Sequence, residues 1–394
     1  QVFVASMSLF TVGTLFAATA PGFELLLTGR IVQASGTALM LPLLMNTVLN
    51  LVPAHRRGRM MGVISIVIAV APAIGPTISG IILQALDWRW MFWLVLPIAL
   101  VAFAVGFRLV KNVTPTSKPS FDAASVVLSA LAFGGLVYGL SSIGHSAEGS
   151  SVPVWIPLVV GAVALAVFVQ RQIARQDSDR ALLNLRPFST PTFSIGLGML
   201  TISMMALFGA LILLPLYLQN IRGLDTLTTG LLLLPGGLAM GVLAPFVGRV
   251  FDRVGPRPLV IPGSIVVSLA LWLMTLLDAD SALPMVVAIH CILMIGLATI
   301  MTPLMTSSLG SLPPQYYSHG SAIFSTIQQL AGAAGTALFV TVMSTTATSR
   351  IASGVGDVAA NQDGIHTAFL CGGVVSLIAV AASFFIRKPT SQPG

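Results

Sequence analysis

The chain has 394 residues, of which 56% are hydrophobic and only 8% are charged. Soluble domains carry about 25% charged residues, and the mean hydropathy of this chain is +0.95, so the composition excludes an ordinary soluble protein and indicates one that crosses a membrane many times. The formal net charge is +7, but the basic residues are scattered through short segments between apolar ones, which favours membrane orientation over nucleic-acid binding.

Long apolar segments recur along the whole chain. A helix that spans the bilayer needs about 20 predominantly apolar residues, and the segments that meet this requirement are 2–19, 25–50, 58–83, 90–109, 122–144, 154–174, 192–219, 226–249, 258–277, 284–310, 318–346 and 365–386. We therefore expect an all-α polytopic membrane protein with twelve transmembrane helices. Both cysteines, Cys291 and Cys371, lie within apolar segments, which argues against a disulfide framework or a metal site.

Lys and Arg residues collect in alternate loops, and this sets the expected orientation. One set of loops holds clusters such as Arg56 to Arg59, whereas the intervening loops hold only Arg89, Arg222 and Arg350. Because cytoplasmic loops carry the excess of positive charge, we expect the first set on the cytoplasmic side, together with the C-terminus. The last external loop is expected over residues 348–364.

The second apolar segment carries Arg30, the one charge that lies clearly inside the apolar part of a segment. Its side chain can extend to the outer membrane interface, about five residues away. Alternatively, it can face the interior of the helix bundle and hydrogen-bond Gln33 one turn along. We favour the second arrangement, in which Arg30 has a role in function.

The acidic residues all fall in loops or at the ends of apolar segments. Ion-coupled carriers usually mark their pathway with carboxylates inside the membrane. The sequence begins inside an apolar segment and without an initiator Met, so we expect that a part precedes Gln1. The protein therefore either uses no such carboxylate or carries it in that part.

The third apolar segment contains small residues at Ala71, Gly75 and Ser79 and prolines at Pro72 and Pro76. A spacing of four puts the small residues on one helix face, where a neighbouring backbone can approach closely. Each proline removes a backbone donor and bends the helix. The pattern predicts a kinked helix whose Ala71, Gly75 and Ser79 face packs against a neighbour.

A charged turn follows the eighth apolar segment. Gly248, Asp252, Arg253, Gly255 and Arg257 lie close together there, on the expected cytoplasmic side. Orientation by positive charge explains the arginines. It does not explain the aspartate or the glycines.

Polar side chains inside apolar segments are candidates for an internal cavity. Asn46, Gln328 and Gln329 are costly in lipid unless they face water or a partner, so each lines a cavity or hydrogen-bonds a neighbouring helix. Adjacent residues do not share a helix face, so at most one of Gln328 and Gln329 is expected to point into a cavity. His290 can titrate near neutral pH, but we favour a structural, hydrogen-bonded histidine.

The sequence lacks the patterns of soluble-type catalysis. There is no Gly-rich phosphate-binding loop that ends in Lys followed by Ser or Thr, so ATP is not expected as the energy source. His145, His319 and His366 do not have metal-ligand spacing. We expect a protein that is not an enzyme and that needs neither a metal nor an organic cofactor.

Several segments together resemble one family. Residues 75–80, GPTISG, resemble the antiporter motif of the fifth helix in drug/proton antiporters of the major facilitator superfamily, and residues 29–36, GRIVQASG, resemble the fourth-helix motif of that superfamily. Residues 86–92, LDWRWMF, are similar to its external turn into helix six, and residues 248–257, GRVFDRVGPR, to its cytoplasmic loop motif. Ser79 stands where glycine is usual, as in the lincomycin-type multidrug exporters.

The order of these motifs implies a longer layout. A fifth-helix motif in the third apolar segment implies two helices before Gln1, hence twelve helices present of a fourteen-helix antiporter. The resemblance divides the chain into residues 1–110, the rest of an N-terminal six-helix half; residues 111–190, an inserted helix pair and cytoplasmic linker; and residues 191–394, a C-terminal six-helix half.

The resemblance also implies a function. It is proton-coupled export of amphiphilic, cationic or neutral drugs across a bacterial inner membrane by a monomeric carrier that alternates its access, with the proton gradient as energy source. Arg30 and Gln33 would adjoin a proton-carrying carboxylate of the first helix. The segment from Ala71 to Gly80 would shape the interface between the halves, and Asp252 with nearby arginines would form a cytoplasmic latch.

Two alternatives stay open from the sequence. The same motifs would suit an exporter of an endogenous lipid, siderophore or antibiotic. A membrane receptor or enzyme that has kept the fold without transporting anything is an alternative of another class.

Overall fold

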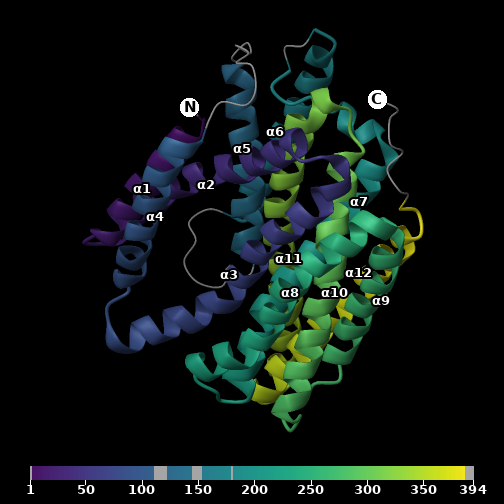
Figure 1. Ribbon diagram of the computed structural model, residues 1–394. Coiled ribbons are helices and arrows are strands. Elements are labelled where there is room, and N and C mark those ends of the chain that lie inside the picture. The colour runs from purple at the N-terminus through teal and green to yellow at the C-terminus, as the bar shows by residue number, and fades with distance from the viewer. Residues whose placement is uncertain (1, 111–121, 144–152, 179–180, 387–394) are drawn as a thin grey trace.

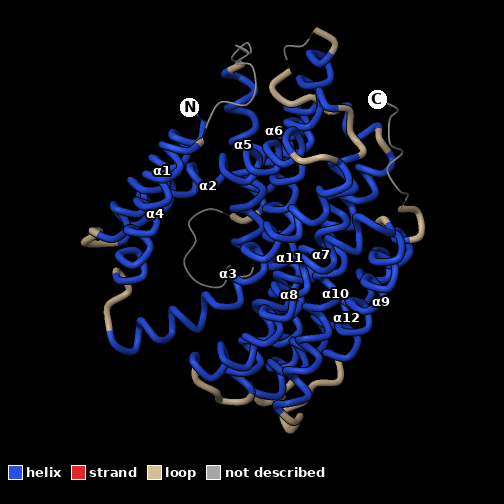
Figure 2. Tube along the Cα trace, viewed as in Figure 1, coloured by secondary structure: helices blue, strands red, loops and turns tan. Residues whose placement is uncertain are grey.

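The computed structural model describes residues 2–110, 122–143, 153–178 and 181–386. These residues form twelve α-helices joined by short loops and 3-10 turns, as Figure 2 shows, and contain no strand. The helices are α1 (Val2–Ala18), α2 (Phe23–Leu51), α3 (Arg57–Ala85), α4 (Trp90–Leu109), α5 (Ala123–Ile143), α6 (Trp155–Gln176), α7 (Pro191–Leu216), α8 (Thr226–Val254), α9 (Arg257–Met274), α10 (Leu283–Gly310), α11 (Tyr317–Ala352) and α12 (Asp357–Ser383).

The expected all-α membrane fold is confirmed. Ten of the described helices are long and apolar enough to cross a membrane, and α1 is a shorter apolar helix of 17 residues. The expected loop over residues 348–364 is wrong, because α11 continues to Ala352 and α12 already begins at Asp357. Arg350 joins the two extended ends through its Nε, 2.7 Å from Asp363 Oδ2, and Asp357 lies in the first turn of α12, where a negative charge suits the helix dipole.

The helices form two groups that α3 connects. Figure 1 shows α7 to α12 together in one bundle, with α1, α2 and α4 in a smaller group beside it. α5 packs against α6 and α11. The largest buried apolar cluster lies in the α7 to α12 bundle, and the ends of α2 and α3 reach into it with Leu49 and Met61.

α3 packs along α8 because small residues let the two backbones approach. A Cβ on Gly62 would lie 2.5 Å from the carbonyl oxygen of Ala244, and one on Gly230 would lie 3.0 Å from Oγ1 of Thr77. Gly80 packs against Leu227 farther along the same face. Such close antiparallel contact is typical of small-residue interfaces in membranes.

The face of α3 that packs is different from the predicted one. Ala71 is exposed, and no described atom comes within 4 Å of a Cβ built on Gly75. Thr77 and Gly80 pack instead, and Thr77 lies about 200° around the helix from Gly75. The side chains of Pro72 and Pro76 lie outside the described ones, so the predicted kink stays a prediction.

A buried ion-pair cluster ties α5 to α6. Asp122, directly before α5, accepts hydrogen bonds from Arg171 Nε at 3.1 Å, from Arg171 Nη2 at 3.0 Å and from Arg175 Nη1 at 2.8 Å. Ser125 donates to the same carboxylate at 2.5 Å. The Arg171 guanidinium, helped by the Ser125 hydroxyl, holds the pKa of Asp122 well below its usual range.

This cluster continues into the linker before α7. Gln172 donates to Ser125 Oγ at 2.8 Å and accepts a hydrogen bond from the backbone N–H of Leu183 at 3.0 Å. The next residue, Asn184, donates its backbone N–H to His319 Nδ1 of α11 at 3.2 Å. The α5–α6 pair is thus hydrogen-bonded, through the linker, to the α7 to α12 bundle.

We expect Asp122→Asn to lower the thermal stability of the detergent-solubilised protein, because Arg171 and Arg175 lose their anionic partner. The depressed pKa means that the carboxylate stabilises the fold above its usual titration range and loses this effect as pH falls, so the difference from wild type should shrink below about pH 4. The control is Asp177→Asn, since that side chain is 79% exposed in its pair with Arg186 whereas Asp122 is 7% exposed. Equal melting temperatures for both variants at pH 7 would contradict the expectation.

Candidate functional site

A carboxylate of α8 binds the N-terminus of α3. Asp252 Oδ1 accepts the backbone N–H of Gly58 at 2.8 Å, and Oδ2 accepts that of Arg59 at 2.9 Å. Both amides lie in the first turn of α3, where they have no partner within their own helix and where the helix dipole attracts a negative charge. Asp252 therefore caps α3 from a different helix and from the other part of the protein.

Glycines on both sides make this contact possible. A Cβ on Gly58 would lie 2.5 Å from Asp252 Oδ1, and one on Gly248 would collide with the backbone carbonyl of Gly58. Gly255 ends α8 with φ at 82° and donates its N–H to Phe251 O at 2.8 Å. A positive φ favours glycine, which accounts for its place in the turn.

The arginines of this turn do not form the expected charge network with Asp252. In the described residues Asp252 binds backbone amides rather than arginine side chains. Arg257 begins α9 and donates to the backbone oxygen of Phe384 at the end of α12, at 2.8 Å. Arg253 is exposed. A helix N-terminus supplies the positive partner that the sequence suggested would be a guanidinium.

A second contact between the two groups of helices was not foreseen. Arg57, the first residue of α3, donates to Leu49 O at 2.7 Å and to Val52 O at 3.1 Å, at the end of α2. It also donates to the hydroxyl of Tyr317 in α11 at 3.2 Å, with its guanidinium 5.4 Å from the ring centroid. In the sequence Arg57 is one of several loop arginines, and nothing there distinguishes it from an orientation charge.

Arg30 and Gln33 lie in a short hydrogen-bond chain. Arg30 Nη1 donates to Gln33 Oε1 at 2.7 Å, so the expected bond is present. Gln33 Nε2 donates to Thr14 Oγ1 of α1 at 2.8 Å, and Thr14 donates to Phe10 O at 2.7 Å. Gln33 and Thr14 are buried while Arg30 is exposed. Thr14 was not singled out from the sequence, because one hydroxyl in an apolar segment is a weak signal.

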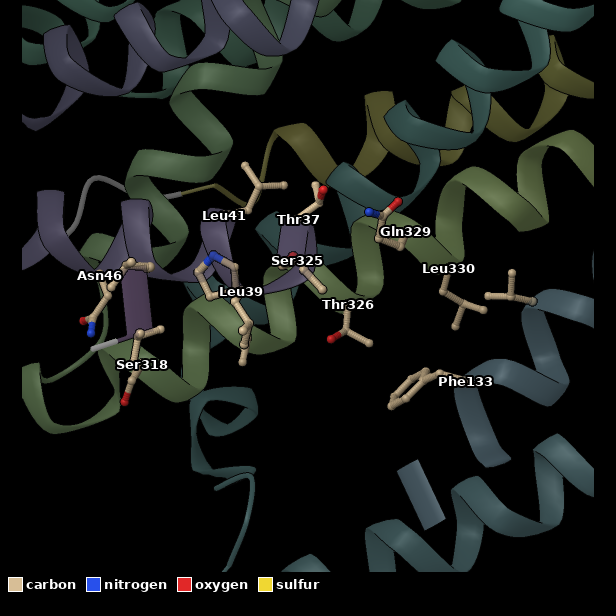
Figure 3. A pocket seen from close by; sticks show the side chains of 16 residues that line it. Thr37, Leu39, Leu41, Asn46, Phe133, Ser318, Ser325, Thr326, Gln329 and Leu330 are labelled. Carbon is tan, nitrogen blue, oxygen red and sulfur yellow. The ribbon is translucent and has the colours of Figure 1, made fainter. Parts of the chain in front are cut away.

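A cavity of about 650 Å³ lies between α2, α5 and α11 (Figure 3). Asn46 and Gln329 both line it. Gln328 points to a different side of α11, where its Nε2 lies 3.7 Å from Met204 Sδ of α7. Of the two glutamines that the sequence offered as cavity candidates, Gln329 lines this cavity and Gln328 does not.

Other polar residues are buried away from this cavity. His290 of α10 packs its ring against Gly236 of α8. Within the described part of the chain, no group of three or more His, Cys, Asp or Glu residues could hold a metal ion. Two described polar features lie between the two groups of helices, namely the contacts of Asp252 and Arg57 at the start of α3 and the cavity.

Comparisons with known proteins all point to one family of membrane transporters. A family model described as Major Facilitator Superfamily matches residues 1–336. The lincomycin resistance protein LmrB of Listeria monocytogenes is 45% identical over 388 residues, which are 97% of this chain and 82% of the relative. The protein of the same name from Bacillus subtilis is 41% identical over 383 residues, which are 95% of this chain and 79% of the relative.

Solved structures show a similar fold at low sequence identity. The human organic anion transporter MFSD10 superposes with a TM-score of 0.63 at 15% identity, covering 97% of this chain and 76% of the other. The proton:xylose symporter XylE superposes with a TM-score of 0.61 at 14% identity, covering 98% of this chain and 80% of the other.

Proposed function

This chain belongs to the Major Facilitator Superfamily. Because contacts at the start of α3 also join its two groups of helices beside a cavity, we propose that it exports amphiphilic drugs in exchange for protons. The homologues support a drug-efflux transporter in a cell membrane rather than an enzyme. Proton exchange, the bacterial inner membrane, a cytoplasmic C-terminus and a monomeric carrier belong to the proposal.

The bond between Asp252 and the N-terminus of α3 carries this proposal. A carrier that alternates its access needs contacts that hold one side closed and that can be broken without unfolding either half. Two hydrogen bonds from one carboxylate, beside a glycine contact, meet this need because they lie between helices and not within one. Arg57 and Tyr317 add a second such contact at the same end.

Proton coupling rests on Arg30 in this proposal. Its guanidinium donates to Gln33, lies 5.9 Å from the ring centroid of Phe92 and belongs to an exposed residue, so it can also pair with a carboxylate. A nearby cation keeps such a group ionised until substrate or conformation separates the two charges.

Lincomycin uptake into inverted membrane vesicles tests the function. We expect uptake that depends on a pH gradient and collapses with a protonophore, and we expect Arg30→Ala to lower the gradient-driven rate by about tenfold or more. The control is Arg350→Ala, which removes an exposed ion pair with Asp363 and should leave the rate unchanged. Uptake that persists without a proton gradient would refute proton exchange.

A further inference from the structure

The cavity between α2, α5 and α11 has no charged residue among those that line it. Its size falls within the range of about 300–1,000 Å³ that is usual for small-molecule sites. Its polar groups are hydroxyls and carboxamides on an otherwise apolar wall, namely Thr37, Asn46, Ser318, Ser325, Thr326 and Gln329.

The charges nearest to this cavity along its own helices do not supply a negative partner. Asp122, about 16 Å along α5 from the lining residue Phe133, is already bound by Arg171 and Arg175. Glu24 lies about 20 Å along α2 from Thr37. Arg30 lies closer to Thr37 along α2 than Glu24 does, but its side chain is positively charged. A cation that bound in the cavity would lose part of its water without gaining a counter-charge, and this loss costs free energy.

The polar groups on α11 are available to a ligand. The side chains of Ser325, Thr326 and Gln329 make no hydrogen bond within the described part of the chain, whereas the Thr37 hydroxyl donates to Gln33 O at 3.1 Å and keeps lone pairs free. The carboxamide of Gln329 offers two donors and an acceptor. Hydroxyl, carbonyl and amide groups of a ligand can pair with these side chains without any charge.

Polar and apolar residues are interspersed along the cavity, with Gln329 close to Leu330 and Leu39 between Asn46 and Ser325 (Figure 3). Figure 3 shows Asn46 and Ser318 at one end and Phe133 and Leu330 at the other. Ser318 and Leu330 are about 18 Å apart along α11. An elongated molecule that carries polar groups along an apolar body matches this arrangement.

We propose that this cavity selects uncharged amphiphiles that bear hydroxyl, carbonyl or amide groups, and that it discriminates against permanent cations. The proposal rests on the function proposed above, because it names the substrate class of the same transporter. The family resemblance implies cationic or neutral drugs as substrates, and this proposal restricts them to the neutral ones.

Binding of three matched fluorescent probes to the purified protein in detergent tests this inference. The probes are dansylcadaverine, its N-acetyl derivative, which is neutral, and its trimethylammonium derivative, which is a permanent cation. We expect the N-acetyl probe to bind at least about tenfold more tightly than the trimethylammonium probe. Equal or tighter binding of the permanent cation, or no binding of the N-acetyl probe, would overturn the proposal.

Gln329→Glu places a carboxylate in the cavity wall and should reverse this preference. We expect it to raise the affinity for the trimethylammonium probe by about tenfold and to lower the affinity for the N-acetyl probe. The control is Gln328→Met, which alters the adjacent residue beside Met204 and should leave all three affinities unchanged. An unaltered preference in Gln329→Glu would show that the probes bind elsewhere.

These outcomes are independent of proton coupling. Binding in detergent requires no gradient, so a failure of gradient-driven lincomycin uptake would leave the order of the probe affinities unaffected. Conversely, a preference for the cation would overturn the proposed selectivity while leaving proton-driven transport intact.

Discussion

Asp252→Asn is expected to open the protein at the end where α3 begins and to abolish most transport. The carboxylate binds two amides at the positive end of α3, and asparagine keeps one acceptor oxygen but presents an N–H₂ group to the other amide. At a partly exposed position such a charge-assisted contact is worth about 2 kcal/mol. Its loss would shift the ratio of closed to open states by a factor of about 30.

Spin labels at Met60→Cys on α3 and Val250→Cys on α8 would report this opening, because both side chains are exposed. The distance distribution between them should gain a longer component in Asp252→Asn, and lincomycin uptake should fall in parallel. The native Cys291 and Cys371 would first be replaced by serine.

The matched control is Asp225→Asn. Asp225 also caps a helix N-terminus, accepting the N–H of Thr228 at 2.9 Å, but the helix is its own and lies within one group. It should leave the distance distribution at the start of α3 as in wild type. A latch role for Asp252 would be refuted if the two variants behaved alike.

Gly248→Ala is expected to separate α3 from α8 and to reduce both stability and transport. The added methyl group would collide with the backbone carbonyl of Gly58, which cannot move aside as a flexible side chain would. Overpacking of this kind costs about 1–3 kcal/mol. Because the collision lies beside Asp252, the helix shift should also lengthen the two hydrogen bonds that Asp252 accepts.

Melting temperature and the same spin-label distance would measure this effect. Gly62→Ala, one turn deeper at the Ala244 carbonyl, should act in the same direction. Gly198→Ala in α7 is the control, because no atom lies within 4 Å of a Cβ built there. Wild-type melting and uptake in Gly248→Ala would show that the close approach of the two helices is not required.

Much of the fold follows from local properties of the sequence. Hydrophobicity over about 20 residues predicts a membrane helix because the bilayer interacts with each segment separately. The different directions of Gln328 and Gln329 likewise follow from helix geometry alone, because adjacent residues are about 100° apart around the axis. The ends of α11 and α12 do not, because polar residues near Arg350 and Asp363 extend these helices beyond their apolar parts.

The packing face of α3 depended on the tertiary structure. Lipid tails are as apolar as leucine, so the hydrophobic pattern of a membrane helix does not tell which side meets protein and which meets lipid. Small residues occur on more than one side of α3, and the sequence drew attention to Ala71, Gly75 and Ser79. The structure instead packs Gly58, Gly62 and Gly80 against α8.

By itself the sequence determined an all-helical membrane protein and its family resemblance, and it singled out the turn around Asp252 as a candidate site. Only the tertiary structure decided what Asp252 binds, since its partners precede it by 194 and 193 residues, and Arg57 and Tyr317 are 260 residues apart. Such pairs form because packing brings distant helix ends together. Asp252 binds two backbone N–H groups, and every residue type except proline has such a group. No side-chain pattern marks a backbone N–H as the partner of a carboxylate, so the contact becomes visible only once α3 and α8 lie side by side.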